Sequence, residues 1–239
     1  MYIINKIYLN PFLTHIYEVL PFYLIFESIN YIANKKKYND FNQKYFLLHF
    51  IVNSINTIIL IPLIYIMFSD PLLKTQEITN WNLLSYIYPM LIGLHTFHLV
   101  HHIKEIKNDE ILHHLITHIF WYGINYCKSN PLYIIPIIAM SGIPGGITYL
   151  MLFLQKLGYL SKLTEKYISM NLNIWIRAPI CIISSALMYV KNTEEYLIEK
   201  NDFNYYITLF MILFTFINGV HFMNNIIDSY YKSYFDKMK

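Results

Sequence analysis

Long apolar runs are the feature of this chain that most constrains what it can fold into. A helix needs about 20 mostly apolar residues to cross the hydrocarbon core of a bilayer. Seven stretches come close to that length, approximately at residues 12–33, 45–68, 83–103, 111–127, 132–155, 170–190 and 205–227. The sequence therefore predicts an all-α membrane protein built as a bundle of about seven transmembrane helices.

The composition supports a membrane protein and argues against several other classes. Of the 239 residues, 56% are hydrophobic and only 14% are charged, whereas soluble domains carry about 25% charged residues. The net charge of +3 is small and no basic stripe occurs, so we expect no nucleic-acid partner. Both cysteines, Cys127 and Cys181, fall in apolar stretches, so we expect no disulfide framework.

The apolar runs follow one another without a soluble domain or a long linker. We expect an N-terminal segment with the first span at 1–44, one membrane domain at 45–230 and a cytoplasmic tail at 231–239. No cleaved signal peptide is expected, because a basic region before a short apolar core is missing. Glycines at 142, 145 and 146 indicate that the fifth span packs closely against a neighbouring helix.

The lysines predict how the bundle is oriented. Lysine and arginine are retained on the cytoplasmic side of membrane proteins. With seven spans, twelve lysines collect in the loops and tail of one side and five collect on the other. We therefore expect the N-terminus to be lumenal or outside and the C-terminus to be cytoplasmic.

Seven of the ten histidines lie within 24 residues, on the third and fourth predicted spans. His95, His98 and His102 share one helix face, and His114 and His118 are four residues apart on the next helix. The short loop between these spans makes them antiparallel neighbours, so the two groups should meet near the lysine-rich surface. Because ionisable side chains in a bilayer usually face the bundle interior or a wet cavity, we expect a functional site there.

Arg177 is the single arginine of the chain and lies inside the sixth predicted span. A buried guanidinium needs an acidic or carbonyl partner, or an anionic ligand. Two interpretations stay open: an ion pair with Glu18 or Glu27 of the first span, or contact with a lipid phosphate or carboxylate. We expect structural roles for the three isolated histidines, His15, His49 and His221.

Residues 109–117 read Asp-Glu-Ile-Leu-His-His-Leu-Ile-Thr: an acid, a His-His pair, two residues and a threonine. About one span later comes Ser-Gly-Ile-Pro at 141–144, and Arg177 lies two spans after the histidine pair. This pattern, over residues 45–230, resembles the TLC-domain family of multi-span membrane proteins, which includes the ceramide synthases. The resemblance implies a protein of lipid metabolism in the endoplasmic reticulum or a derived membrane, with membrane lipids as partners.

In the ceramide synthases the histidine pair is associated with acyl transfer from acyl-coenzyme A to a sphingoid amine. Carried over, the catalytic candidates are His113 and His114, with Asp109 positioned to orient His113. The resemblance implies acyl-coenzyme A as co-substrate, with no metal and no resident cofactor. Two acids of the ceramide synthases have no counterpart here, since those positions fall near Ser141 and Pro144. The candidates for substrate binding are Thr117, His118, Arg177, His95 and His98.

Three functional hypotheses remain open at this point. The first is a lipid acyltransferase, and the second is a TLC-type protein that binds lipid or alters membrane composition without catalysis. The third is a di-iron lipid hydroxylase or desaturase, because the histidine spacings at 98–102 and 113–118 are similar to the histidine boxes of those enzymes. Imidazole is a suitable ligand for iron.

Overall fold

The computed structural model describes residues 11–35, 40–70, 84–106, 111–119, 132 and 135–238, and these are helical apart from short turns between the helices. No strand occurs within these ranges. The helices are α1 (Pro11–Lys35), α2 (Phe41–Ser69), α3 (Leu84–His102), a helical segment at 111–119, α5 (Ile135–Ile137), η2 (Ile138–Gly142), α6 (Ile143–Lys156), α7 (Lys162–Leu172), η3 (Asn173–Arg177), α8 (Ala178–Glu199) and α9 (Asp202–Met238).

Four helices are long and apolar enough to cross a membrane. They are Phe41–Pro62, Ile135–Lys156, Lys162–Ile198 and Asp202–Met238, and they fall on the second, fifth, sixth and seventh predicted stretches. α1 and α3 form where the first and third stretches were expected. The segment 111–119 begins the fourth, and the rest of that stretch lies outside the described residues. The all-helical, membrane-compatible architecture is thus confirmed.

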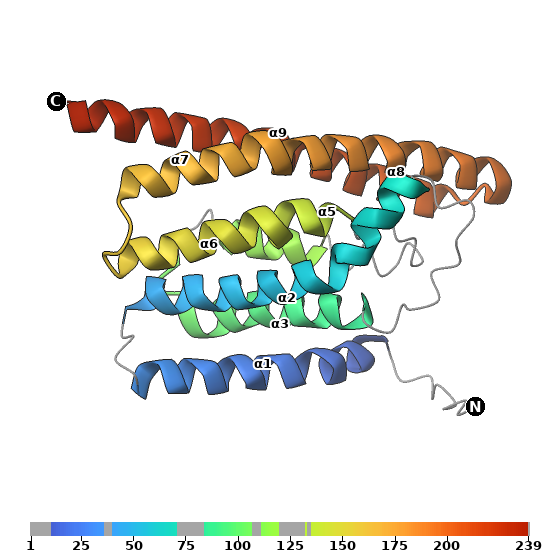
Figure 1. The fold of residues 1–239 in the computed structure, drawn as a ribbon. Coiled ribbons are helices and arrows are strands. Elements are labelled where there is room, and N and C mark those ends of the chain that lie inside the picture. The colour runs from blue at the N-terminus through green and yellow to red at the C-terminus, as the bar shows by residue number, and fades with distance from the viewer. Residues whose placement is uncertain are drawn as a thin grey trace.

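The helices lie side by side along most of their length (Figure 1). α1 runs along one edge, α7 and α9 run along the opposite edge, and α2, α3 and α6 lie between them. The closest packing partners are α2 with α6, α8 with α9, and α1 with α3. At one end of the bundle α1 and α6 finish while α2 and α7 begin. We call it the lysine-rich end, because its described residues include Lys35, Lys44, Lys156 and Lys162.

The core is apolar, and so is much of the outer surface. Ile87, Leu91 and Phe97 of α3 are almost completely buried, and α3 packs on both α1 and α2. Large apolar side chains also point outward, among them Ile183 of α8 and Leu213 of α9, each exposed over about half of its surface. An apolar exterior of this extent is typical of a surface that contacts lipid.

Two glycines permit unusually close helix contacts. A Cβ atom added at Gly145 of α6 would lie 2.9 Å from the side-chain nitrogen of Asn53 on α2. At Gly219 of α9 it would lie 2.6 Å from the Cβ atom of Cys181 on α8. The close packing predicted for the glycine-rich fifth span is therefore present at Gly145.

Candidate functional site

A cavity of about 410 Å³ opens between the helices and is lined by side chains from α2, α3, the segment 111–119, α5, η2, α6, α7, η3 and α9. Its volume is within the range of small-molecule sites in proteins. Four of the residues that the sequence nominates line it: His95, His113, Thr117 and Arg177. The structure thus brings the third, fourth and sixth predicted spans together around one space.

The helical spacing on α3 places its histidines as expected. His95, His98 and His102 are all buried, and His98 has no exposed surface. His95 reaches the cavity, whereas His98 lies behind it, next to Tyr45 of α2 with ring centroids 4.3 Å apart. His98 is therefore close to the site without lining it.

The two histidines of the His-His pair have different surroundings. His113 is an exposed residue that lines the cavity, and its ring centroid lies 5.8 Å from that of His95. His114 is completely buried, and its Nδ1 atom shares a hydrogen bond with Nδ1 of His95. One imidazole of that bond must donate while the other accepts, so the two rings hold different tautomers. A ligand in the cavity can therefore contact His113, while His114 positions His95.

Of the remaining residues predicted for the site, Thr117 and His118 lie at its edge. Thr117 lines the cavity, and its hydroxyl donates to the backbone carbonyl of His113 at 2.8 Å. His118 is partly buried, with its ring centroid 6.3 Å from that of His95. Asp109, expected to orient His113, lies outside the described residues.

Arg177 contacts α9, and Glu27, one of the two glutamates proposed for it, has another partner. Its Nη2 atom donates to the side-chain oxygen of Asn218 at 2.8 Å, and its Cζ atom lies 4.0 Å from the centroid of the Phe222 ring. Glu27 instead forms an ion pair with His101 of α3, which also hydrogen-bonds to the Tyr23 hydroxyl. The interpretation of Arg177 as the partner of Glu27 is therefore wrong. α1 packs on α3, so its acids lie away from η3.

Arg177 is the last residue of a π-helical turn, η3. η2 and η3 each contain five residues, and each ends two residues before a proline, Pro144 and Pro179. Proline lacks an N–H and clashes with the carbonyl four residues earlier, so a widened turn accommodates it. η2 and η3 both contribute residues to the cavity wall, as is common for π-turns at functional sites.

His49 of α2 belongs to the site, although we expected it to be structural. It lines the cavity, and its ring stacks on Tyr149 of α6 at 4.3 Å and on His98 at 4.9 Å. A signal for it exists in the sequence, because Asn53 and Asn56 follow at helical spacing on a mostly apolar span. Such a polar stripe on a spanning helix predicts a face turned toward the interior of the bundle.

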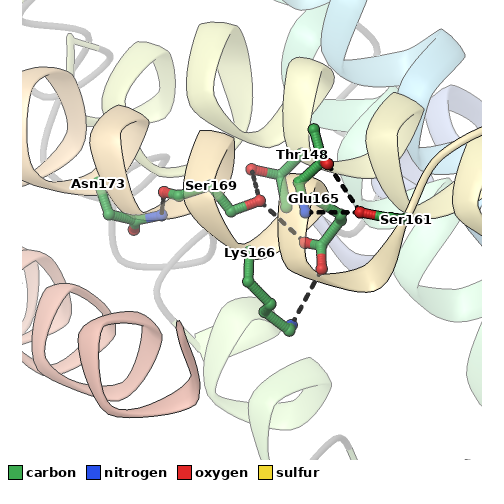
Figure 2. A network of polar contacts seen from close by, with 7 residues as sticks. Thr148, Ser161, Glu165, Lys166, Ser169 and Asn173 are labelled. Carbon is green, nitrogen blue, oxygen red and sulfur yellow. Dashed lines mark hydrogen bonds and ion pairs between the residues drawn. The ribbon is translucent and has the colours of Figure 1, made fainter. Parts of the chain in front are cut away.

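A buried carboxylate forms another part of the cavity wall that the sequence did not indicate. Glu165 of α7 is 2% exposed and accepts a hydrogen bond from Ser169 at 2.9 Å. Its other oxygen lies 3.3 Å from the amine of Lys166 (Figure 2). Figure 2 also shows Asn173, one helical turn after Ser169, whose side-chain amide donates a hydrogen bond to the backbone carbonyl of Ser169. The negative charge of Glu165 is therefore balanced locally.

The described residues provide no evident metal centre. Within them, no group of three or more histidine, cysteine, aspartate or glutamate side chains is arranged to hold a metal ion.

Comparisons of the chain with protein-family models, with curated proteins and with solved structures each gave no match. The arguments for function therefore rest on the cavity and its side chains.

Proposed function

We propose that this chain is a multi-pass membrane enzyme of lipid metabolism, similar to TLC-domain proteins, in which His113 is the general base of an acyl transfer to a membrane lipid. The observation that supports this most directly is the shared cavity. His95, His113 and Arg177 come from three different helices and line one space among helices able to cross a membrane. Convergent polar groups in an otherwise apolar pocket are typical of ligand sites.

The proposed chemistry needs one accessible imidazole. His113 removes a proton from the amine or hydroxyl of the lipid as that group attacks the thioester carbonyl of acyl-coenzyme A. The new bond to the carbonyl carbon forms, the carbon–sulfur bond breaks, and the proton passes to the thiolate of coenzyme A. His95, fixed by its hydrogen bond to His114, completes the polar wall beside the reacting groups.

We further propose the seven-span topology for the whole chain, with the lysine-rich end in the cytoplasm and the protein in the endoplasmic reticulum. α1 begins at the opposite end of the bundle from the point where α9 finishes (Figure 1), which is compatible with an odd number of spans. Acyl-coenzyme A is a cytoplasmic and highly anionic molecule. Exposed lysines at that end, such as Lys156 of α6 and Lys162 of α7, would favour its approach.

Lipid profiling of cells that express the protein tests the function. Wild type is compared with His113→Gln and with His101→Gln, a matched control on α3 outside the cavity wall. Expression of wild type should change the amounts of acyl-lipid species in the cells. Since general-base catalysis contributes about 10²- to 10⁴-fold to the rate, His113→Gln should abolish this change while the protein still inserts into the membrane. His101→Gln should keep the change.

Two outcomes would contradict the proposal. If wild type and His113→Gln alter the lipid profile equally, the protein acts by binding lipid and not by catalysis. If His101→Gln is as inactive as His113→Gln at equal expression, the loss reflects folding and not the chemistry of His113.

A further inference from the structure

Several buried polar atoms in the cavity wall lack a hydrogen-bond partner in the described structure. They are both side-chain atoms of Asn53, the side-chain oxygen of Asn173, Nε2 of His49 and Nε of Arg177. Asn53, Asn173 and His49 are each at least nine-tenths buried. Buried polar groups in native proteins almost always have partners, because leaving them unpaired loses their hydration without replacement. Their convergence on one space indicates a polar occupant.

Within the part of the chain that the structure describes, the positive charge of Arg177 in the cavity wall has no acidic partner. Arg177 donates a hydrogen bond to the neutral side chain of Asn218 and lies over the Phe222 ring, and no ion pair between it and a carboxylate occurs among the described residues. The acid that lines the cavity, Glu165, is already engaged by Lys166 and Ser169. The guanidinium of Arg177 is part-buried, with its Nε atom fully buried, so a missing counter-ion is costly. An anionic group can pair with a guanidinium through two parallel hydrogen bonds.

We propose that the cavity binds the headgroup of an anionic lipid, with a phosphate or carboxylate on Arg177. Asn53 and Asn173 then hydrogen-bond the remaining polar atoms of the headgroup, and the apolar wall residues Leu91 and Phe214 contact the first carbons of the chains. This inference rests on the proposed function in one respect, because it names the substrate class of the same site.

Phe222 connects the anion site to the proposed general base. Its ring lies under the Arg177 guanidinium and also contacts the His113 ring, with centroids 6.4 Å apart. An oxyanion held by Arg177 would therefore place the rest of the headgroup beside His113. Binding of the charged headgroup by Arg177 would hold the lipid in a fixed orientation, which favours its reaction at His113.

Binding to the full-length protein in detergent tests the inference. The probes are phosphatidylglycerol, oleate, diacylglycerol and inorganic phosphate, each measured with wild type, Arg177→Gln, Arg177→Lys and Lys232→Gln. Phosphatidylglycerol or oleate should bind wild type at least tenfold more tightly than diacylglycerol does. Arg177→Gln should remove that preference, Arg177→Lys should keep part of it, and Lys232→Gln, a charge control on the exposed part of α9, should keep it fully.

Two results of this comparison would overturn the inference. Equal binding of diacylglycerol and the anionic lipids by wild type would exclude a headgroup anion. Binding of inorganic phosphate as tight as that of the anionic lipids would make the site a free-anion site instead of a lipid site.

Asn53→Leu provides a test that does not depend on Arg177. Leucine has a similar volume and removes both unpaired atoms, so the empty protein should be at least as stable as wild type. Lipid binding should nevertheless weaken about tenfold, which a purely structural asparagine would not cause. Unchanged binding with Asn53→Leu would contradict the assignment of Asn53 to the headgroup.

His113→Gln separates this inference from the proposed function. If the variant binds anionic lipid normally but has lost turnover, both stand. If wild type binds anionic lipid with the Arg177 dependence but never changes the lipid profile, the function is wrong and the lipid class is right. If turnover depends on His113 without any anionic preference, the inference fails alone.

Discussion

Gly219 and Cys181 illustrate how single residues set the spacing of this bundle. They bring the backbones of α9 and α8 so close that an added methyl group at Gly219 would lie 2.6 Å from the Cβ atom of Cys181. That neighbour is attached directly to the backbone and cannot move aside. The contact is therefore a sensitive probe of the packing between these two helices.

Gly219→Ala should lower the free energy of unfolding by about 1–3 kcal/mol, the usual cost of overpacking. Gly146→Ala is the matched control on α6, because its nearest neighbour would lie at an ordinary 3.6 Å. The control should be neutral or stabilise by up to about 1 kcal/mol, as alanine favours helix over glycine. Thermal denaturation in detergent compares the two, and equal melting temperatures would show that α8 and α9 are not packed as described.

The two histidines of the His-His pair should also differ when they are changed singly. His114→Ala removes the partner of buried Nδ1 of His95 and should destabilise the protein by about 1–3 kcal/mol. His113→Gln faces the cavity and should leave the melting temperature near that of wild type. Calorimetry of both variants checks this, and the reverse order of stabilities would be inconsistent with the hydrogen bond between His95 and His114.

At the scale of residues, helical spacing predicted part of the site and missed part. The burial of His95, His98 and His102 followed from their spacing on one helix. His49 was missed although Asn53 and Asn56 mark the same helix face, because the three residues were not read together as a polar stripe. Glu165 was missed because one acid on a polar helix does not show which neighbour it will face. Phe222 and Asn218 were missed for the same reason: they join the site only through the packing of α9 on η3.

At the scale of elements, Arg177 is the last residue of the π-turn η3, and we expect this turn to set the direction of its side chain. Without it the helix would continue with α-helical spacing, and residues on either side would rotate relative to each other by about 100°. The sequence contained a proline two residues later as a hint, yet proline alone does not distinguish a kink from a widened turn.

Pro179→Ala restores the missing N–H and allows η3 to return to an α-helix. We expect Arg177 to turn away from the cavity, so that anionic-lipid binding weakens at least tenfold while the melting temperature stays the same or rises. Pro62→Ala in α2 is the control, because Pro62 is exposed and outside the cavity wall. Unchanged binding of phosphatidylglycerol by Pro179→Ala would mean that the π-turn does not determine the direction of the Arg177 side chain.

At the scale of the whole molecule, the apolar runs predicted an all-helical membrane body correctly. Helix positions follow directly from run lengths, and even α1, with Glu18 and Glu27, forms where it was expected. What the runs could not give is how far helices extend past the apolar stretch. The sixth predicted stretch belongs to a helix that begins earlier, at Lys162, and its polar first turns supply Glu165 and Lys166 to the cavity.

The proposed orientation gives a prediction for single cysteines introduced in a Cys127→Ser, Cys181→Ser background. Lys232→Cys on α9 should react with a membrane-impermeant maleimide from the cytoplasmic side only, and Lys200→Cys, between α8 and α9, from the lumenal side only. Both positions are exposed. Labelling of the two cysteines from the same side would contradict the proposal that α9 crosses the membrane between them.

Photo-crosslinking with an anionic lipid that carries a diazirine next to its headgroup tests the central claim most directly. If the cavity is the lipid site, mass spectrometry should locate the crosslinks on residues of its wall, such as His113, Asn218 and Phe222, and Arg177→Gln should abolish them. Crosslinks confined to outward-facing residues such as Ile183 and Leu213, unchanged by Arg177→Gln, would contradict it.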